Sequence, residues 1–471
     1  MTTRVTLHDY RTDPLLPQKD GVNLAHENFA TLLRQQDDPN LIVSFHDFTR
    51  LLVDETYAHA MLDDVDCVVS NVGPHAHFYF WLREQLGLNY RIIRDARTAI
   101  WSSYLHQEYL CAPYLRAGDT LLVASHYTWG VYNKIFPHLA NFPTLLCYPL
   151  TACFPVERPV HRAIDRPPGG DFVLGYLGRL SEDKNFPDIV ELLIRLNNQD
   201  KRGYRYRLIA CGDVHSDSCT PSRIQQRILE ALGPGDFFDY LPARNNSEIW
   251  DVMALFDVMI FPSTSNLETL GRVLIEASYA RVPILSGDHA ATVELVAPGG
   301  LCRVDYRLDE TFSAHFDHRL GSISMSDMID VITRQSFGLS DCYDRYDRHP
   351  EIFLERIADP APALATPRLE AVQRAFIDML SVDMPAPLDR KAADAELSNM
   401  VDWFIDLQKK GASVREERLV QLTALSRHPD RTARFVRKSE TTSCDFTNVG
   451  GIDIELCHIS QFYPEFRISR Q

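Results

Sequence analysis

"ETLGRVLIE", residues 268–276, is the most informative stretch of this chain, because it places two acids on either side of a short helical pattern. Its last acid, Glu276, interrupts the apolar run "VLIEASYA". Burying an unpaired carboxylate costs several kcal/mol or forces the group to hold a proton. We therefore expect Glu276 to have a partner, either a buried arginine of the protein or the hydroxyl groups of a ligand.

The sequence around this stretch predicts a strand, a polar loop and a helix. The strand is "DVMIFPS", Glu268 lies in the loop, and Gly271 opens the helix. The free N–H groups of a helix N-terminus favour anions. If the segment were wholly helical, a rise of about 1.5 Å per residue would separate the two acids by roughly 12 Å, about the reach from a sugar ring to a ribose across a diphosphate. Taken alone, Glu268 could equally be a solvated acid or a helix N-terminal charge.

A second stretch, "GYLGRLSEDKN" at residues 175–185, carries the parts of a diphosphate clamp. A strand ends at Gly178, Arg179 follows it, and Lys184 lies near the start of the next helix. Glycine permits close backbone approach, a helix N-terminus favours anions, and the two cations add charge-assisted hydrogen bonds. A basic pair beside a turn is often only solvated, so this signal is weak by itself.

The order of apolar patterns predicts two α/β halves. Short strand-like runs alternate with helical patterns through residues 1–160, and the same alternation restarts over residues 170–310. A proline- and glycine-rich connector, Pro155 to Asp171, separates them. Ligands of open α/β sheets bind at the carboxyl ends of the strands, so we expect a cleft between the halves.

Residues 311–471 are expected to form a mainly helical extension, through which the chain could form oligomers. Its last part, from Cys444, shows an extended pattern to which we assign no function.

The composition excludes several classes of partner. The 471 residues include 48 basic and 64 acidic side chains, a formal net charge of −16, which disfavours nucleic acids and anionic membranes. There is no signal-peptide pattern and no apolar run of about 18 residues, so a cytoplasmic protein without a membrane span is expected. The ten cysteines form no CxxC pair, and we expect reduced, mostly buried thiols and no zinc site.

These motifs, taken in order, resemble the retaining glycosyltransferases of family 4, over about residues 1–305. "GRLSEDKN" is similar to the family's G-R-L followed by lysine, and "ETLGRVLIE" to its E-x7-E element, with "LIACGD" and "LPARNN" in the expected order between them. The resemblance implies a GT-B fold: two Rossmann-like domains that face each other across a cleft, the first for the acceptor and the second for the donor. It also implies a nucleotide diphosphate sugar as donor, UDP- or GDP-linked, and no tightly bound cofactor or metal.

The resemblance assigns roles in the second domain. Arg179 and Lys184 would hold the diphosphate and stabilise its charge as it departs, with Gly178 beside them. Glu268 would contact hydroxyls of the donor sugar, and Glu276 would accept hydrogen bonds from the ribose. Three further residues are implied as donor contacts: the backbone N–H groups of Leu270 and Gly271 at the phosphates, and Arg244 near the base.

The first domain matches the family less closely. The family's glycine-containing first loop has only Gly21, in "QKDGVN", at a similar place. Where many members have a histidine near the reacting carbon, "YRIIRDART" offers Asp95 or Arg94, and "SFHDF" offers His46 and Asp47 as rivals. We expect Asp95 to be the catalytic contact of this domain.

Two departures concern the donor loops. Ala280 and Arg281 stand where the family often has a small residue and glycine, and "GDHAATVELV" lacks the usual double glycine while it retains Glu294. The HxH pair His75 and His77 has no clustered third ligand, so we expect local hydrogen bonding or acceptor contact rather than a metal.

The expected function is transfer of a hexose from a nucleotide diphosphate sugar to a hydroxyl-bearing acceptor, with retention at the anomeric carbon. Two alternatives stay open. One is a nucleotide-sugar enzyme without transfer, such as an epimerase, and the other is a non-catalytic relative that acts as a binding or assembly subunit.

Overall fold

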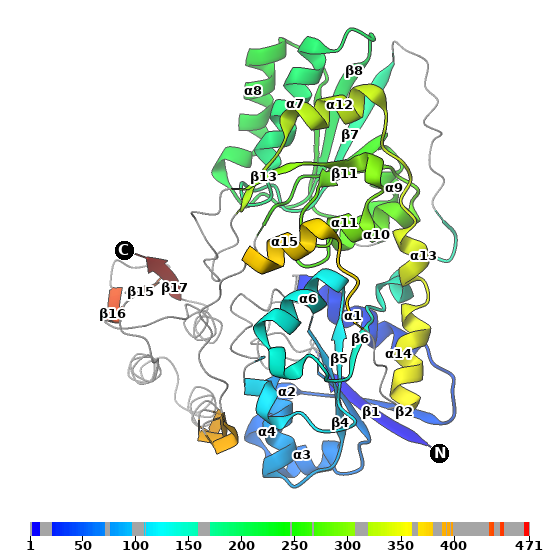
Figure 1. Cartoon of the computed structure of the whole chain (residues 1–471), viewed down its shortest axis with the longest axis vertical. Coiled ribbons are helices and arrows are strands. Elements are labelled where there is room, and N and C mark those ends of the chain that lie inside the picture. The colour runs from blue at the N-terminus through cyan, green and yellow to red at the C-terminus, as the bar shows by residue number, and fades with distance from the viewer. Residues whose placement is uncertain are drawn as a thin grey trace.

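The computed structural model describes residues 2–9, 21–70, 76–96, 108, 110–158, 170–244, 247–265, 268–306, 319–359, 366–379, 389–391, 393–395, 397–398, 433–437, 443–446 and 466–470. Two parallel six-stranded sheets form its framework, one above the other along the long axis of the molecule (Figure 1). Helices flank both sheets, and the two units confirm the expected α/β architecture of two Rossmann-like domains, the GT-B fold.

The N-terminal sheet has the strand order β2-β1-β3-β4-β5-β6. Its short apolar strands are mostly buried, because helices pack on the sheet. The strands are β1 (Thr3–His8), β2 (Leu41–His46), β3 (Cys67–Ser70), β4 (Arg91–Asp95), β5 (Thr120–Val123) and β6 (Thr144–Leu146). The helical elements are α1 (Gly21–Arg34), α2 (Phe48–Val53), α3 (Glu55–Leu62), α4 (His77–Gln85), η1 (Ala112–Tyr114), α6 (His126–Ile135), η2 (Pro137–Leu139) and η3 (Leu150–Cys153).

The second sheet has the order β12-β11-β10-β7-β8-β9. Its strands are β7 (Asp171–Leu177), β8 (Arg205–Cys211), β9 (Phe238–Leu241), β10 (Val258–Phe261), β11 (Ile284–Gly287) and β12 (Leu301–Cys302), and a hairpin pairs β13 (Val304–Tyr306) with β14 (Gly321–Ile323). The helical elements are α7 (Phe186–Gln199), η4 (Asp217–Cys219), α8 (Pro221–Leu232), α9 (Ile249–Met253), α10 (Arg272–Tyr279), α11 (Thr292–Leu295) and η5 (Pro298–Gly300). The strands follow the apolar runs of the sequence closely.

Four helices lie in the described part of residues 325–379, and this part of the chain returns to the first domain. The helices are α12 (Met325–Arg334), α13 (Cys342–Tyr346), α14 (His349–Ala358) and α15 (Ala371–Met379). The α12 helix packs on α7, whereas Phe353 of α14 packs edge-on against Phe29 of α1, with ring centroids 4.8 Å apart. The chain therefore crosses the junction twice, and α14 lies alongside the N-terminal domain (Figure 1).

Strands also occur near the end of the chain. Antiparallel strands β15 (Ala433–Arg437), β16 (Ser443–Phe446) and β17 (Phe466–Arg470) form a three-stranded sheet. The extended pattern predicted from Cys444 falls mostly outside the described residues. Eight described cysteines carry free thiols, seven of them buried. No helix in the described part of the chain is long and apolar enough to cross a membrane.

The two domains meet at the carboxyl ends of their strands, through the N-terminus of α6. The Glu294 carboxylate, which follows β11 in the second domain, accepts hydrogen bonds from the backbone N–H groups of His126 (2.9 Å) and Tyr127 (2.7 Å) in the first domain. The Ser125 hydroxyl, at the cap of the same helix, donates to the Thr269 carbonyl at 3.0 Å. An acid from one domain thus satisfies N–H groups that α6 leaves without intrahelical partners.

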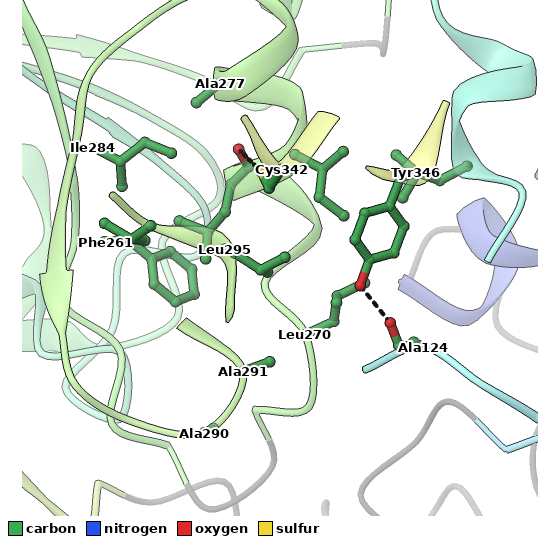
Figure 2. Packing of buried hydrophobic residues seen from close by; sticks show 14 of the residues in the cluster. Ala124, Phe261, Leu270, Ala277, Ile284, Ala290, Ala291, Leu295, Cys342 and Tyr346 are labelled. Atoms are coloured by element: carbon green, nitrogen blue, oxygen red, sulfur yellow. Dashed lines mark hydrogen bonds between the residues drawn. The ribbon is translucent and has the colours of Figure 1, made fainter. Parts of the chain in front are cut away.

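An apolar cluster surrounds this polar contact and includes residues of both domains. Figure 2 shows Leu270 and Leu295 of the second domain packed near Tyr346 of α13. The Tyr346 hydroxyl donates to the Ala124 carbonyl, just after β5, at 2.6 Å. The hydrophobic core is therefore continuous across the junction in this arrangement.

The α15 helix covers the junction. Its Gln373 amide donates to the Ala290 carbonyl at 2.9 Å and to the Glu294 carboxylate at 2.7 Å. The helix and a residue that precedes it also pack closely on Gly130 of α6. A Cβ added to Gly130 would lie 2.9 Å from Ile377 of α15 and 2.8 Å from Leu369, which precedes α15. The helix therefore contacts both sides of the junction at the same point.

We predict that Arg281→Gly stabilises the protein by about 0.5–1 kcal/mol, because Arg281 follows α10 with a left-handed φ of 56° that is unfavourable for any residue but glycine. The side chain is exposed, so little packing is lost. The urea midpoint measures the change. Arg281→Ala still places a residue with a Cβ in the left-handed conformation, so it should give no comparable gain. An equal gain from alanine would contradict the prediction.

We predict that stability falls as the pH drops from about 6.5 toward 4. Burial lowers the pKa of His8, His289 and His349 to about 4, from the ordinary 6.5. Between those values the native protein binds fewer protons than the unfolded chain, so each histidine contributes up to about 1.4 kcal/mol per pH unit, lost on acidification. Urea unfolding at pH 7, 6 and 5 tests this, and His349→Gln should show a shallower slope than wild type.

We predict that Glu294→Gln lowers the free energy of unfolding by about 1–3 kcal/mol, because the amide can no longer accept from both N–H groups of α6. The matched control is Glu351→Gln, the same substitution at a residue of α14 whose side chain is 69% exposed. Equal urea midpoints for the two variants would show that the contact across the junction contributes nothing to stability.

Candidate functional site

Two loops at the carboxyl ends of β7 and β8 approach closely. Gly178 follows β7 directly, and its N–H donates to the Cys211 carbonyl at 3.0 Å. A Cβ added to Gly212 would lie 1.8 Å from the Gly178 carbonyl oxygen, so no other residue fits there. Arg179 comes next and lies 3.4 Å from the Asp183 carboxylate, with 40% of its side chain exposed. Arg179 is therefore accessible at the edge of the sheet where ligands bind in α/β domains.

The structure brings together two residues that are 84 positions apart in the sequence. The Lys184 ammonium lies 3.3 Å from the Glu268 carboxylate, and the two side chains are 17% and 16% exposed. Lys184 precedes α7 and Glu268 precedes α10, so both stand at the starts of helices that follow parallel strands β7 and β10. The loop that follows β7 and the segment that precedes α10 therefore meet at this ion pair.

Glu268 itself lies before the helix, in a turn. Its backbone N–H donates to the Ser265 carbonyl at 3.1 Å, and α10 begins only at Arg272. The estimate of 12 Å between the two acids assumed a wholly helical segment, and this assumption is wrong. Gly271 caps the helix with a left-handed φ of 78°, which glycine adopts without strain.

Glu276 has a partner within the protein. The Arg272 guanidinium, one turn earlier on α10, donates to its carboxylate at 2.6 Å, and the Glu276 side chain is only 8% exposed. Burial acts to lower the pKa of Arg272, but the Glu276 charge and other neighbours raise it overall. Of the two expected kinds of partner, the structure therefore shows an arginine of the protein, although its side chain is partly rather than fully buried.

The remaining predicted donor contacts differ in exposure. Leu270, which lies between Glu268 and the helix cap in the sequence, is buried. Arg244 is exposed, and its guanidinium lies 3.8 Å from the Glu248 carboxylate. An exposed pair of this kind holds its side chains weakly, so Arg244 can turn toward a ligand.

In the first domain, Asp95 and its rivals are all buried or engaged in local structure. Arg94 donates to the Ser70 carbonyl at 3.2 Å and pairs with the Glu108 carboxylate. Asp47 caps α2 by accepting from the Arg50 N–H at 3.1 Å. Asp95 ends β4 and is 4% exposed.

Both ring nitrogens of His46 have partners. Nδ1 lies 2.8 Å from the Thr6 hydroxyl, and Nε2 lies 2.6 Å from the Tyr79 hydroxyl. Burial holds the pKa of His46 well below its ordinary value. These contacts favour a structural role for His46, so Asp95 stays the first-domain candidate.

The remaining predicted residues are Gly21 and the HxH pair of the first domain. Gly21 is the first residue of α1, and His77 is the first residue of α4 and is buried, whereas His75 lies outside the described residues. Within the residues that the structure describes, no group of three or more His, Cys, Asp or Glu side chains could hold a metal ion.

One residue near the site was not singled out from the sequence. His289 is 1% exposed and lies in the loop after β11, where its Nε2 is 3.3 Å from the Ser265 carbonyl. The only signal was a histidine in "PILSGDHAATVELV" among small and apolar residues, which does not distinguish a core residue from a site residue. Only the tertiary structure shows that His289 contacts the same Ser265 carbonyl as the backbone N–H of Glu268.

These loops provide cations, carboxylates and a glycine-capped helix N-terminus at one edge of a parallel sheet. Arg179 and Lys184 can neutralise a diphosphate, and Glu268 and Glu276 can accept hydrogen bonds from hydroxyl groups. The set suits a ligand that combines phosphate and sugar.

Similarity to known proteins was found at two levels. Residues 157–315 match the family model described as glycosyl transferases group 1. No curated protein matches the chain in sequence.

Several solved structures are similar in shape. Anabaena HepE in complex with UDP is 14% identical, with a TM-score of 0.47 over 76% of this chain and 100% of its own. A putative UDP-N-acetylglucosamine 2-epimerase from Listeria monocytogenes is 11% identical, with a TM-score of 0.49 over 78% and 100%. Sucrose-phosphate synthase from Thermosynechococcus elongatus is 13% identical, with a TM-score of 0.43 over 85% and 98%.

All three TM-scores are below 0.5, so the substrates of those proteins are not carried over to this chain. The family match is the more informative similarity, because it spans both loops of the Lys184–Glu268 pair. It supports glycosyl transfer as the general activity. Residues 157–315, which carry the candidate donor site, are therefore similar to group 1 glycosyltransferases.

Proposed function

We propose that this protein is a retaining glycosyltransferase that moves a hexose from a nucleotide diphosphate sugar to a hydroxyl-bearing acceptor. The observation that carries the proposal is the Lys184–Glu268 pair, 3.3 Å apart, beside the glycine-capped start of α10. It lies in the region that matches group 1 glycosyltransferases. A UDP- or GDP-sugar is the proposed donor class.

The diphosphate would bind between the two loops. Arg179 and Lys184 supply positive charge, and the N–H groups of Leu270 and Gly271 supply donors at a helix N-terminus. Both cations already contact acids, Asp183 and Glu268. A diphosphate carries more charge than either carboxylate, so it can compete for these cations when it binds.

The ribose would lie against Glu276. This carboxylate accepts one hydrogen bond from Arg272 and has further lone pairs that can accept hydrogen bonds from ribose hydroxyls. Glu268 would then contact the hydroxyl groups of the sugar on the far side of the phosphates. Arg244 would approach the base.

The chemistry would depend on stabilising the leaving group. As the bond between the sugar and the phosphate lengthens, positive charge develops on the ring and negative charge on the phosphate, which Arg179 and Lys184 stabilise. The departing phosphate oxygen can accept the proton of the incoming hydroxyl on the same face of the sugar, which gives retention. Asp95 would lie on the acceptor side, and closure of the domains would exclude water.

The first test is thermal unfolding with UDP, GDP, ADP and TDP, for wild type and Glu276→Gln. A ligand at about 100 times its dissociation constant adds roughly 2.7 kcal/mol of stability. We predict that one nucleotide raises the wild-type midpoint and that the variant, compared with its own ligand-free midpoint, loses most of the rise because its ribose acceptor is weaker. Glu351→Gln, remote from the site on α14, should respond as wild type does.

The outcomes separate the candidate functions. If no nucleotide shifts the wild-type midpoint, the donor site proposed here is wrong. If a nucleotide binds but its sugar derivatives are neither transferred nor slowly hydrolysed, the protein is a binding or assembly subunit rather than an enzyme.

A further inference from the structure

His289 occupies a tightly defined turn between β11 and α11. Its backbone N–H donates to the Thr292 hydroxyl at 3.0 Å, and its carbonyl accepts from the Thr292 N–H, also at 3.0 Å. The next residue, Ala290, has a left-handed φ of 51° and its carbonyl is held by Gln373. The backbone that carries the imidazole is therefore fixed from both sides.

The ring of His289 is oriented by a contact at each nitrogen. Nε2 lies 3.3 Å from the Ser265 carbonyl, and Nδ1 lies 3.1 Å from the Tyr306 hydroxyl. A carbonyl only accepts hydrogen bonds, so the proton is assigned to Nε2, and Nδ1 accepts from Tyr306. Phe376 of α15 packs edge-on against the ring, with centroids 5.5 Å apart.

The Ser265 carbonyl is where this contact meets the donor site. The same oxygen accepts the backbone N–H of Glu268 at 3.1 Å, which closes the turn that presents the Glu268 carboxylate. Two donors, one from the turn itself and one from His289, therefore converge on one carbonyl. A carbonyl oxygen has two lone pairs and can accept both.

The backbone hydrogen bond to Ser265 constrains the position of Glu268, and with it the position of the Glu268 carboxylate. That carboxylate is 3.3 Å from the Lys184 ammonium, and neither side chain is more than 17% exposed. A shift of this backbone would move the Glu268 carboxylate away from the sugar hydroxyls that it is proposed to contact. Misplacement of about 1 Å in such a site can reduce rates by about a hundredfold.

We propose that His289 is a positioning residue that holds the Ser265–Glu268 turn, and through it the Glu268 carboxylate, in place for the donor sugar. The inference rests on the proposed function, in which Glu268 contacts sugar hydroxyls. Phe376 of α15 packs against the same ring, so His289 links α15 to the segment that carries Ser265 and Glu268. Burial lowers the pKa of His289 to about 4, so the ring stays neutral near pH 7 and acts through its N–H group rather than as an acid or base.

The first arm of the test needs no ligand. Hydrogen exchange of the backbone over residues 264–271 is compared in wild type, His289→Phe and His289→Gln. Phenylalanine keeps an aromatic ring against Phe376 but has no N–H, whereas glutamine can place an N–H near the position of Nε2. We expect exchange to be about five- to tenfold faster in His289→Phe and near wild type in His289→Gln. Equal rates in all three proteins would overturn the bracing role.

The second arm measures affinity by calorimetry for UDP with UDP-glucose and for GDP with GDP-mannose. For the pair that wild type binds, His289→Phe should weaken the nucleotide-sugar about tenfold and the free diphosphate less than twofold, because only the sugar meets Glu268. His289→Gln should recover most of the loss. Equal losses for both ligands would overturn the proposal, since His289 would then support the whole site rather than Glu268.

A further variant covers the case in which His289→Phe does not fold. Tyr306→Phe removes the hydroxyl that orients Nδ1 and leaves the imidazole in place, so a smaller change of the same sign is expected in both arms. If wild type binds neither pair, the proposed function and the sugar-positioning role fail together, and the exchange experiment still shows whether His289 braces the turn.

Discussion

The contact of Glu294 with the N-terminus of α6 is the constraint on which the arrangement of this protein depends. The Glu294 carboxylate accepts hydrogen bonds from two backbone N–H groups of the opposite domain, at 2.7 and 2.9 Å. It also accepts one from the side-chain amide of Gln373 in α15, at 2.7 Å. Burial raises the pKa of Glu294, whereas these hydrogen bonds act to lower it. The contact orients the second sheet so that the carboxyl ends of its strands face those of the first.

The charges of the proposed donor site are already paired within the protein. Lys184 contacts Glu268, Arg179 contacts Asp183, and Arg272 contacts Glu276. Such pairing stabilises partly buried charges when no ligand is bound, because an unpaired charge at a partly buried position would destabilise the folded protein. A bound donor would replace some of these ion pairs with contacts of its own. Changes to the acids beside Lys184 and Arg272 are therefore expected to alter ligand affinity as well as stability.

Much of the architecture could be predicted from local patterns. The strand predicted in "DVMIFPS" is β10, and the strand predicted to end at Gly178 is β7, because buried parallel strands require continuous apolar residues. Arg281, which has a left-handed φ, stands where the resemblance leads one to expect glycine. The 12 Å estimate applied to a wholly helical segment, and this condition is not met because α10 begins only at Arg272, after the Gly271 cap.

The sequence by itself determined the two parallel α/β units and brought attention to Arg179, Lys184, Glu268 and Glu276, because strand patterns and short motifs are local properties of the chain. Only the tertiary structure decided which of these residues meet. The pairing of Lys184 with Glu268, and the position of His289 behind the Glu268 turn, depend on β7, β10 and β11 lying together in one sheet. The physical reason is that contacts between residues far apart in sequence are set by strand order and packing, which no local pattern encodes.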